Sequence, residues 1–550
     1  MNEQFDPISH LALLKIPEAS LSQLGFCASA KIAGVRTWVN QLRATQVIST
    51  SVSLYRALPE VVRLKTEPAT RFEMLEALRS IVHQTVVGLT KEFLHQPLIL
   101  PEQAQKTAII AQALQKNMLD GYSAIVLELG KSSKVNNFER LIFIQALHRA
   151  ITALGLMFFR SFQLYTQVPQ GLWAHLHLLY RCAKFYELQD SPVEDLVHTN
   201  KVTTIEQAYM RVLALGAARL NQVAQNDVSS VYDALAEWSR YIQLKSPADL
   251  TSNNLYWVNL TRDRGPLLKE RHEGPVDSLV IELNFKVLLN QLNAKDSVGV
   301  DYKKGLIPEE FPASLLLHVQ NAWGNLSSRD LERRSTGDAA SVCVGFSECH
   351  YQIAGEQAFD KFLNQDRPRQ NNEPTNYSPV GRLAKQATDD EPRAVPLGLV
   401  FSVALVNLSA GGYCIEWAAD VPAQLEAGDL IAVREAGRRT WNLCVVRWIR
   451  RQKDVTQVGV QLISTQAQAF AASAQYEDGN YSSFMRAFYL PAARHGQGPA
   501  HLLSPAMPFQ EYQPVRLRQD GQTTNGKLEN CVLATAKLRQ FAITTFDTEN

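Results

Sequence analysis

The chain has 550 residues, with 55 Lys or Arg against 54 Asp or Glu, and a formal net charge of +1. At roughly 100–200 residues per domain, this length predicts three or four domains. Because no overall excess of basic residues is present to neutralise a long phosphate backbone, the composition argues against DNA or RNA as a partner. It leaves room for a small anion held by a few local arginines.

The seven cysteines are scattered along the chain, and no CxxC motif occurs. An odd number without metal-binding spacing argues against a disulfide framework or a zinc site and predicts a reducing compartment. The first ten residues, MNEQFDPISH, lack the basic and apolar regions of a signal peptide. The apolar stretches are too short and too interrupted to span a bilayer. We therefore expect a cytoplasmic protein with no transmembrane segment.

Glycine divides the chain into two parts, because residues 1–250 hold 8 of the 28 glycines and residues 251–550 hold 20. Glycine is unfavourable inside helices, so the first part is expected to be helical. Apolar residues recur there at three- and four-residue steps over 71–89, 103–127, 137–165, 171–188 and 204–223. Thr203 and Glu206 resemble a capping pair. These patterns predict an all-helical domain over 1–245, of bundle or repeat-like type, with about eight helices.

Residues 246–325 have a mixed character and predict a connecting α/β segment. Residues 255–260 alternate as a strand does, whereas 279–292 and 312–323 have helical spacing. Because the segment offers strand 255–260 no other partner, one hypothesis is that this strand completes the β-rich C-terminal region over 486–550. No pattern in this segment indicates a chemistry of its own.

Residues 366–396 are polar and contain five prolines, which predicts a flexible loop interrupting a folded domain. Short apolar segments on both sides predict the strands of a small antiparallel barrel: 340–346, 398–406, 412–417, 430–435, 440–449 and 457–464. Three more strand candidates predict a small β-rich C-terminal region over 486–550: 515–518, 531–535 and 539–545. The predicted fold class is therefore α+β and multidomain, with an all-helical domain followed by a barrel and a β-rich tail.

Two short motifs lie in the β region. The first is an R-x-x-x-R pattern extended by a third arginine: Arg329, Arg333 and Arg334. The second is an N-x-S-x-x-G pattern between two predicted strands, with a second glycine inside it: Asn407, Ser409, Gly411 and Gly412. Each motif alone is short, and their order before a series of barrel strands makes them informative.

Together, these motifs and strands resemble the PilZ domain family, whose pattern is R-x-x-x-R followed by [DN]-x-S-x-x-G. The resemblance covers residues 325–475, and we expect a PilZ-like domain over 326–475. The motifs are 74 residues apart, from Arg333 to Asn407, which is more than family members usually have. The polar loop over 366–396 accounts for most of the excess, and such an insertion is thermodynamically tolerable because loop-closure cost grows slowly with length.

The resemblance implies a receptor for cyclic di-GMP, a bacterial second messenger. Arginine suits this ligand because its planar fork pairs with phosphate oxygens, stacks on purines and matches the O6 and N7 acceptors of guanine. Asn407 and Ser409 are placed to contact a guanine edge, while Gly411 and Gly412 allow close backbone approach. The implied protein is an effector rather than an enzyme, has no cofactor, and relays binding to the helical domain or to a protein partner.

The same residues also have simpler interpretations. The three arginines fit the solvated C-terminal end of a helix, where cations are favoured. The Asn-Leu-Ser-Ala-Gly-Gly segment fits an ordinary hairpin turn. Arg447, within the apolar strand 440–449, is interpreted as an exposed strand position rather than a ligand contact.

Other candidate sites are weaker. His175 and His177 have metal-like spacing, but residues two apart on a helix point in different directions, which predicts a structural role. Cys349 and His350 are adjacent without further signs of a thiol nucleophile. No GxSxG, Walker or HExxH motif occurs. An enzyme is therefore the least favoured hypothesis, and the main alternative is a PilZ-like scaffold that binds proteins and no nucleotide.

Overall fold

The structure is a computed structural model, and it divides into two compact units. The first contains residues 1–329 with the short segments 421–424 and 450–453, and the second contains the remainder. The described residues are 6–546, except 95, 97–99, 132–136, 199–200, 246–254, 273, 275, 277–278, 294–304, 325–333, 365–397, 410, 418–420, 423–424, 453–454 and 493–498. The predicted loop over 366–396 therefore lies outside the described residues.

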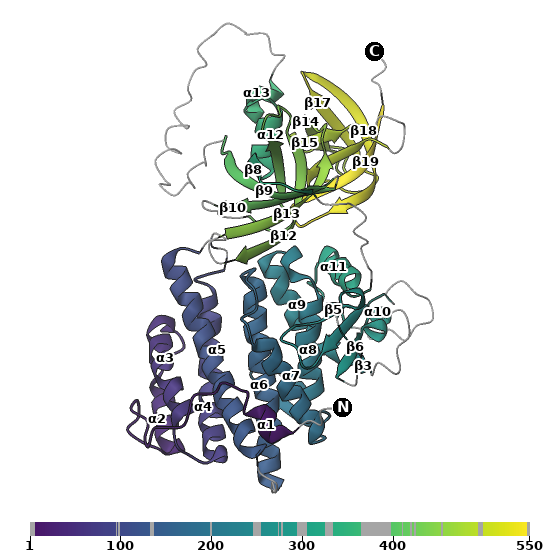
Figure 1. The fold of residues 1–550 in the computed structure, drawn as a ribbon. Coiled ribbons are helices and arrows are strands. Elements are labelled where there is room, and N and C mark those ends of the chain that lie inside the picture. Colours follow the sequence, from purple (N-terminus) through teal and green to yellow (C-terminus); the bar gives the residue numbers. More distant parts are fainter. Residues whose placement is uncertain are drawn as a thin grey trace, which may run out of the picture. The chain divides into compact units, whose positions relative to one another are not determined.

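The first unit is mainly helical, as the sequence predicts (Figure 1). Its helices up to residue 245 are α1 (Pro7–Leu11), α2 (Ile32–Gln41), α3 (Val47–Arg63), α4 (Pro68–Thr90), α5 (Glu102–Leu129), α6 (Asn137–Gln163), α7 (Leu172–Phe185), α8 (Ile205–Ala217) and α9 (Gln225–Trp238). A short hairpin of β1 (Pro192–Asp195) and β2 (Lys201–Thr204) separates α7 from α8.

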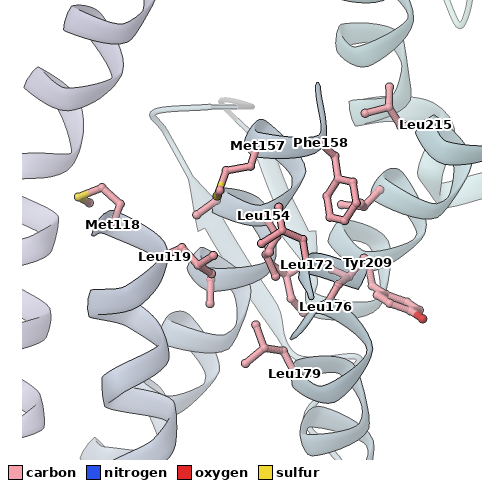
Figure 2. Close-up of a cluster of buried hydrophobic side chains, with 14 of the residues drawn as sticks. Met118, Leu119, Leu154, Met157, Phe158, Leu172, Leu176, Leu179, Tyr209 and Leu215 are labelled. Atoms are coloured by element: carbon pink, nitrogen blue, oxygen red, sulfur yellow. The ribbon is translucent and has the colours of Figure 1, made fainter. Parts of the chain in front are cut away.

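The core of the helical unit is formed where α5, α6, α7 and α8 face one another. Figure 2 shows apolar side chains from all four helices meeting there, among them Leu119, Leu154, Leu176 and Tyr209, all fully buried. Helix α6 is apolar and long enough to cross a membrane, but 78% of its most apolar window is buried inside the unit. Its hydrophobicity is therefore accounted for by its place at the centre of the bundle.

The start of α8 differs by one residue from the predicted capping pair. Thr204, rather than Thr203, accepts the backbone N–H of Gln207, and the Gln207 side chain accepts the N–H of Thr204 in return. The hydroxyl of Thr203 lies instead 2.7 Å from Nε2 of the buried His148. Thr203, which the sequence spacing predicts as the cap of α8, thus makes a tertiary contact instead.

A small antiparallel sheet follows the bundle, in the order β3-β6-β4-β5. Its strands are β3 (Gln243–Lys245), β4 (Tyr256–Asn259), β5 (Leu267–Leu268) and β6 (Val280–Asn284), and α10 (Lys286–Asn293) and α11 (Ala313–Gly324) come after it. The predicted helix over 279–292 is thus wrong in its first part, because strand pairing with both β3 and β4 overrides the helical spacing. The idea that 255–260 completes the C-terminal region is also wrong, since β4 pairs with β5 and β6.

A buried ion-pair network ties α4 and α6 to β1. Asp195 is fully buried, and both of its oxygens lie 2.6 Å from Nη2 of Arg79, while Nη1 of Arg149 is 3.6 Å away. Burial by itself would raise the pKa of Asp195, but the two guanidinium groups outweigh it and hold the pKa well below its usual range. Removing one partner from such a pair costs about 3–5 kcal/mol, because a buried charge is left uncompensated.

Four histidines of this unit are strongly desolvated. Burial lowers the pKa of His148, His175 and His198 to about 3 and that of His177 to about 4. Each is therefore neutral in the folded protein near pH 7 and resists protonation on acidification.

The second unit contains two β-barrels (Figure 1). The first barrel closes in the order β10-β13-β12-β11-β8-β9, with β9 pairing back to β10 and β7 added beside β9. Its strands are β7 (Arg334–Ser335), β8 (Ala339–Val344), β9 (Phe401–Ser409), β10 (Gly412–Trp417), β11 (Leu430–Glu435), β12 (Asn442–Gln452) and β13 (Val455–Ser464). The six predicted barrel strands all correspond to strands of this barrel.

The second barrel is closed by six antiparallel strands in the order β14-β15-β16-β19-β18-β17. They are β14 (Gln468–Ala474), β15 (Met485–Leu490), β16 (His501–Pro505), β17 (Pro514–Gln519), β18 (Gln522–Ala534) and β19 (Leu538–Phe546). All three predicted C-terminal strands are present, and β14, β15 and β16 complete the closure.

The two barrels share a hydrophobic core through α12 (Phe346–Ile353), which is followed by α13 (Phe359–Leu363). Cys349 of α12 packs in one cluster with Leu430 of the first barrel and Phe488 of the second. Polar contacts reinforce this junction, since Nζ of Lys537 lies 2.6 Å from Asp429 and 3.3 Å from Glu426. The first barrel therefore rests on a partner barrel rather than standing alone.

We predict that the helical unit loses stability as the pH falls from 7 to 5. The unfolded chain takes up protons at its histidines below about pH 6.5, whereas the folded chain does so only near pH 3–4, so folding becomes less favourable with acidification. Each such histidine contributes up to about 1.4 kcal/mol per pH unit in this window. Urea unfolding followed by circular dichroism at 222 nm tests this.

The variant His148→Gln should have a shallower pH dependence than the wild type, because one of the depressed groups is gone. Unchanged stability between pH 7 and 5, or identical slopes for both proteins, would contradict the prediction.

Candidate functional site

The predicted N-x-S-x-x-G segment forms the tight turn between β9 and β10. The hydroxyl of Ser409 accepts the backbone N–H of Gly411 at 3.3 Å and contacts the carbonyl of Gly412 at 3.5 Å. The carbonyl of Gly411 accepts the N–H of Leu462 at 2.9 Å. The turn is therefore closed by its own serine and tied to the neighbouring strand β13.

Gly412 is required by the close approach of two strands. Its φ is +144°, and a Cβ at this position would lie 2.0 Å from the carbonyl oxygen of Val460. No side chain fits in that space. Glycine at this position thus lets β10 lie against β13 at the end of the turn.

The strand register places three of the predicted residues on one outer face of the barrel. Ser409 is opposite Gly412, which is opposite Gln461, and Asn407 lies two residues before Ser409 on the same strand. Residues directly opposite in antiparallel strands share a face, and residues two apart along a strand do so too. Ile415 and Val458 belong to the opposite face and are buried in the barrel interior. A shift of register between Leu405 and Asn407 breaks the alternation along β9, and Leu405 is buried with them.

Arg447 reaches this outer face, although the sequence interpretation treated it as an exposed strand position. Its Nε donates a hydrogen bond of 2.5 Å to Oε1 of Gln461, the residue opposite Gly412. Burial lowers the pKa of Arg447, and its side chain is half-buried. The strand pattern contains Arg447, but only the β12–β13 arrangement shows that it lies beside the turn.

Trp448 packs on the same outer face. A Cβ on Gly459 would lie 2.0 Å from Nε1 of Trp448. The indole therefore packs over β13 in the space that a side chain at residue 459 would occupy. Gly459 is opposite Cys414, which is opposite Asn407. Trp448 is partly exposed, and its indole thus covers a position two strands away from the asparagine of the motif.

The arginines of the first motif are only partly within the described residues. Arg334 is exposed and starts β7, where it is opposite Leu408, while its neighbour Ser335 is opposite Asn407. Arg334 therefore pairs with β9 close to the turn. It is aligned with Leu408, however, and so with the face of β9 opposite to that of Asn407 and Ser409. Arg329 and Arg333 lie outside the described residues.

The weaker candidates of the sequence analysis have structural roles. Nε2 of His175 contacts the hydroxyl of Ser123 at 3.0 Å, and His177 lies between the hydroxyl of Tyr209 and the carbonyl of Arg264. The two rings serve different contacts, as their spacing on the helix predicts.

The Cys349–His350 pair is also structural. Both side chains are fully buried, and burial raises the pKa of the Cys349 thiol well above its usual range. Nε2 of His350 lies 3.0 Å from the carbonyl oxygen of Phe470, so it contacts the second barrel rather than the thiol. This arrangement disfavours a nucleophile.

Comparison with protein families places this barrel in a known class. Residues 255–397 and 381–469 match the model described as "Cyclic-di-GMP receptor FimW, middle PilZ domain". The region that contains the first barrel is therefore identified as a PilZ domain. The match begins at residue 255, well before residue 325, where the sequence analysis placed the start of the resemblance.

The rest of the chain matches the two companion models. Residues 33–249 match the FimW N-terminal domain, and residues 470–546 match the FimW C-terminal β-barrel domain. Over 97% of its length, the chain is 28% identical to the protein named cyclic-di-GMP receptor FimW from Pseudomonas aeruginosa, of which 93% is covered. No solved structure matches the chain.

We predict that Gly412→Ala destabilises the second unit by at least about 2 kcal/mol, because strained backbone and a steric clash add up. Gly437→Ala is the matched control, since Gly437 also has a positive φ of +75° but would place its Cβ in open space. The control should cost only the backbone strain, about 1 kcal/mol. Chemical unfolding followed by tryptophan fluorescence measures both, and equal losses would show that contact with Val460 is not the cause.

Proposed function

We propose that this protein is a receptor for cyclic di-GMP and binds the dinucleotide on the outer face of the first barrel. One observation carries the proposal. Asn407, Ser409 and Gly412 share one face of the barrel, and Gln461 holds the guanidinium of Arg447 beside that face. The PilZ match of this region and the name of the Pseudomonas relative, a cyclic-di-GMP receptor, support the same ligand.

The groups on this face have the chemistry that guanine and phosphate need. Asn407 offers an amide for a base edge, and Ser409 offers a hydroxyl at a turn where the backbone is open to approach. Arg447 supplies a positive charge whose desolvation strengthens its attraction for an anion. We propose that Arg329 and Arg333 complete the site by pairing with the phosphates. Arg334 is aligned with the other face of β9, so we do not expect it to reach a phosphate on this face.

Trp448 adds an aromatic surface to the proposed site. Base–aromatic stacking contributes about 1–3 kcal/mol per base. Because the indole packs over Gly459, its position depends on the absence of a side chain there. We propose that a guanine stacks near this indole while Asn407 contacts its edge.

The proposed role is binding rather than catalysis. The polar groups gathered here are amide, hydroxyl and guanidinium, none of which is a general base near neutral pH. Binding changes the protein only if the ligand favours one conformation over another. Because Arg329 and Arg333 lie in the chain segment between the helical domain and the barrel, we propose that binding is relayed to the helical domain or to a protein partner there.

We also propose that the protein acts in the cytoplasm. All seven cysteines are free, and Cys343 and Cys349 have sulfurs 3.9 Å apart without a bond between them. Such thiols are kept reduced in the cytosol.

The direct test is calorimetry with purified full-length protein and cyclic di-GMP. We predict that Arg333→Ala, Ser409→Ala and Arg447→Ala each weaken binding about tenfold or more, since a charge-assisted or buried hydrogen bond is lost. Arg438→Ala, an exposed arginine in the loop after β11, is the control and should bind as the wild type does. No heat at about 100 μM ligand would refute the proposal and favour a scaffold that binds only proteins.

A second prediction concerns the indole. Trp448→Ala should weaken binding about tenfold. Gly459→Ala should do the same by displacing the indole, although it deletes no side chain that is proposed to contact the ligand. Wild-type affinity in both variants, with unchanged thermal unfolding, would exclude the indole from the site.

A further inference from the structure

The small sheet of the first unit borders a cavity of about 510 Å³ that the proposed receptor function does not use. This volume is within the usual range for small-molecule sites. The cavity is lined by residues of β4, β5 and the adjoining loops: Gln170, Trp257, Asn259, Arg262, Asp263, Arg264, Gly265, Leu267 and His272. All of them belong to the first unit.

The cavity lies on the face of the sheet that is turned away from the helical core. Along β4, Tyr256 and Val258 belong to the main hydrophobic cluster, whereas Trp257 does not. Since side chains alternate along a strand, Trp257 and Asn259 point to the other face. Trp257 is nevertheless only 7% exposed, because the edge of His272 and the ammonium of Lys269 cover its ring at 5.2 Å and 5.3 Å.

Two ring nitrogens in the cavity wall are buried without a hydrogen-bond partner. They are Nε1 of Trp257 and Nε2 of His272. The indole nitrogen is a donor only, so it requires an acceptor. A buried polar group left unpaired costs about 1–3 kcal/mol, and native proteins keep few of them unless a water or ligand completes them.

The loop that forms the cavity rim is held firmly. Asp263 accepts the backbone N–H groups of Gly171 and Ala174 at the start of α7, at 2.5 and 3.0 Å. The carbonyl of Arg264 contacts Nε2 of His177 at 2.9 Å. Backbone contacts and the side chain of Asp263, the acidic residue among the described residues that line the cavity, therefore preorganise the rim.

Among the described residues that line the cavity, the charges other than that of Asp263 are positive. Within the part of the chain that the structure describes, neither Arg262 nor Arg264 forms an ion pair, and Asp263 is already engaged by α7. The groups left for a ligand are thus chiefly donors: two guanidinium groups and one indole N–H. A ligand complementary to them carries acceptor oxygens and negative charge.

We propose that this cavity binds a small organic anion, no larger than a mononucleotide, whose carboxylate or phosphate oxygens accept hydrogen bonds from Arg262, Arg264 and the indole N–H of Trp257. This site is separate from the proposed dinucleotide site. A ligand bound here would supply acceptors for the donors that the fold leaves unpaired. The helical unit would then have a ligand-binding site of its own.

Calorimetry with full-length protein tests the site with four probes: guanosine monophosphate, citrate, inorganic phosphate and uncharged guanosine. We expect at least one organic anion to bind with a Kd below about 1 mM and guanosine not to bind. The double variant Arg262→Gln/Arg264→Gln should weaken this binding about tenfold or more. The control Arg56→Gln/Arg140→Gln removes the same charge from exposed positions of α3 and α6 and should leave it unchanged.

A spectroscopic readout locates the ligand. The indole ¹H–¹⁵N resonance of Trp257, assigned by its loss in Trp257→Phe, should shift when the organic anion is added. The proposal is overturned if neither organic anion binds, if the Arg262/Arg264 double variant binds like the wild type, or if the Trp257 resonance does not move at saturation. Inorganic phosphate binding as tightly as both organic anions would also overturn it, because the site would then hold a bare oxyanion.

Discussion

The candidate site depends on one close contact between backbones, that of Gly412 with the carbonyl of Val460. A side chain at residue 412 would separate β10 from β13, and the register on both sides of the turn would be lost. That register is what sets Ser409 opposite Gly412 and Gly412 opposite Gln461. Arg447 is held by Gln461, so the position of its guanidinium follows from the same contact.

The surroundings of the first barrel make this face rigid. Through α12 the two barrels share one hydrophobic cluster, and Lys537 bridges Asp429 and Glu426 just before β11. Burial would raise the pKa of Asp429, and the lysine opposes that shift. A surface supported from behind loses little conformational entropy when a ligand binds to it, so this packing favours the binding proposed for the first barrel.

The helical unit is organised by a different kind of constraint. Its centre is apolar, but Arg79, Arg149 and Asp195 form a buried ion-pair network that joins two long helices to a hairpin. Such a network constrains the arrangement of these elements, because removing one partner would leave a buried charge uncompensated. The small sheet that follows is covered by the bundle on one face and leaves donors without acceptors on the other, where the cavity lies.

The sequence by itself determined that a helical part precedes a β-rich part, and that the N-x-S-x-x-G motif lies between two strands. Both follow from periodicity and turn residues, which are local properties of the chain. The sequence predicted the long helices, the six strands of the first barrel and the N-x-S-x-x-G turn. The tertiary structure alone decided that 280–284 forms a strand, that Thr204 rather than Thr203 caps α8, and that Arg447 and Trp448 share the face of Asn407. Each of these outcomes depends on which distant strand or side chain lies opposite, and one-dimensional patterns carry no information on pairing partners.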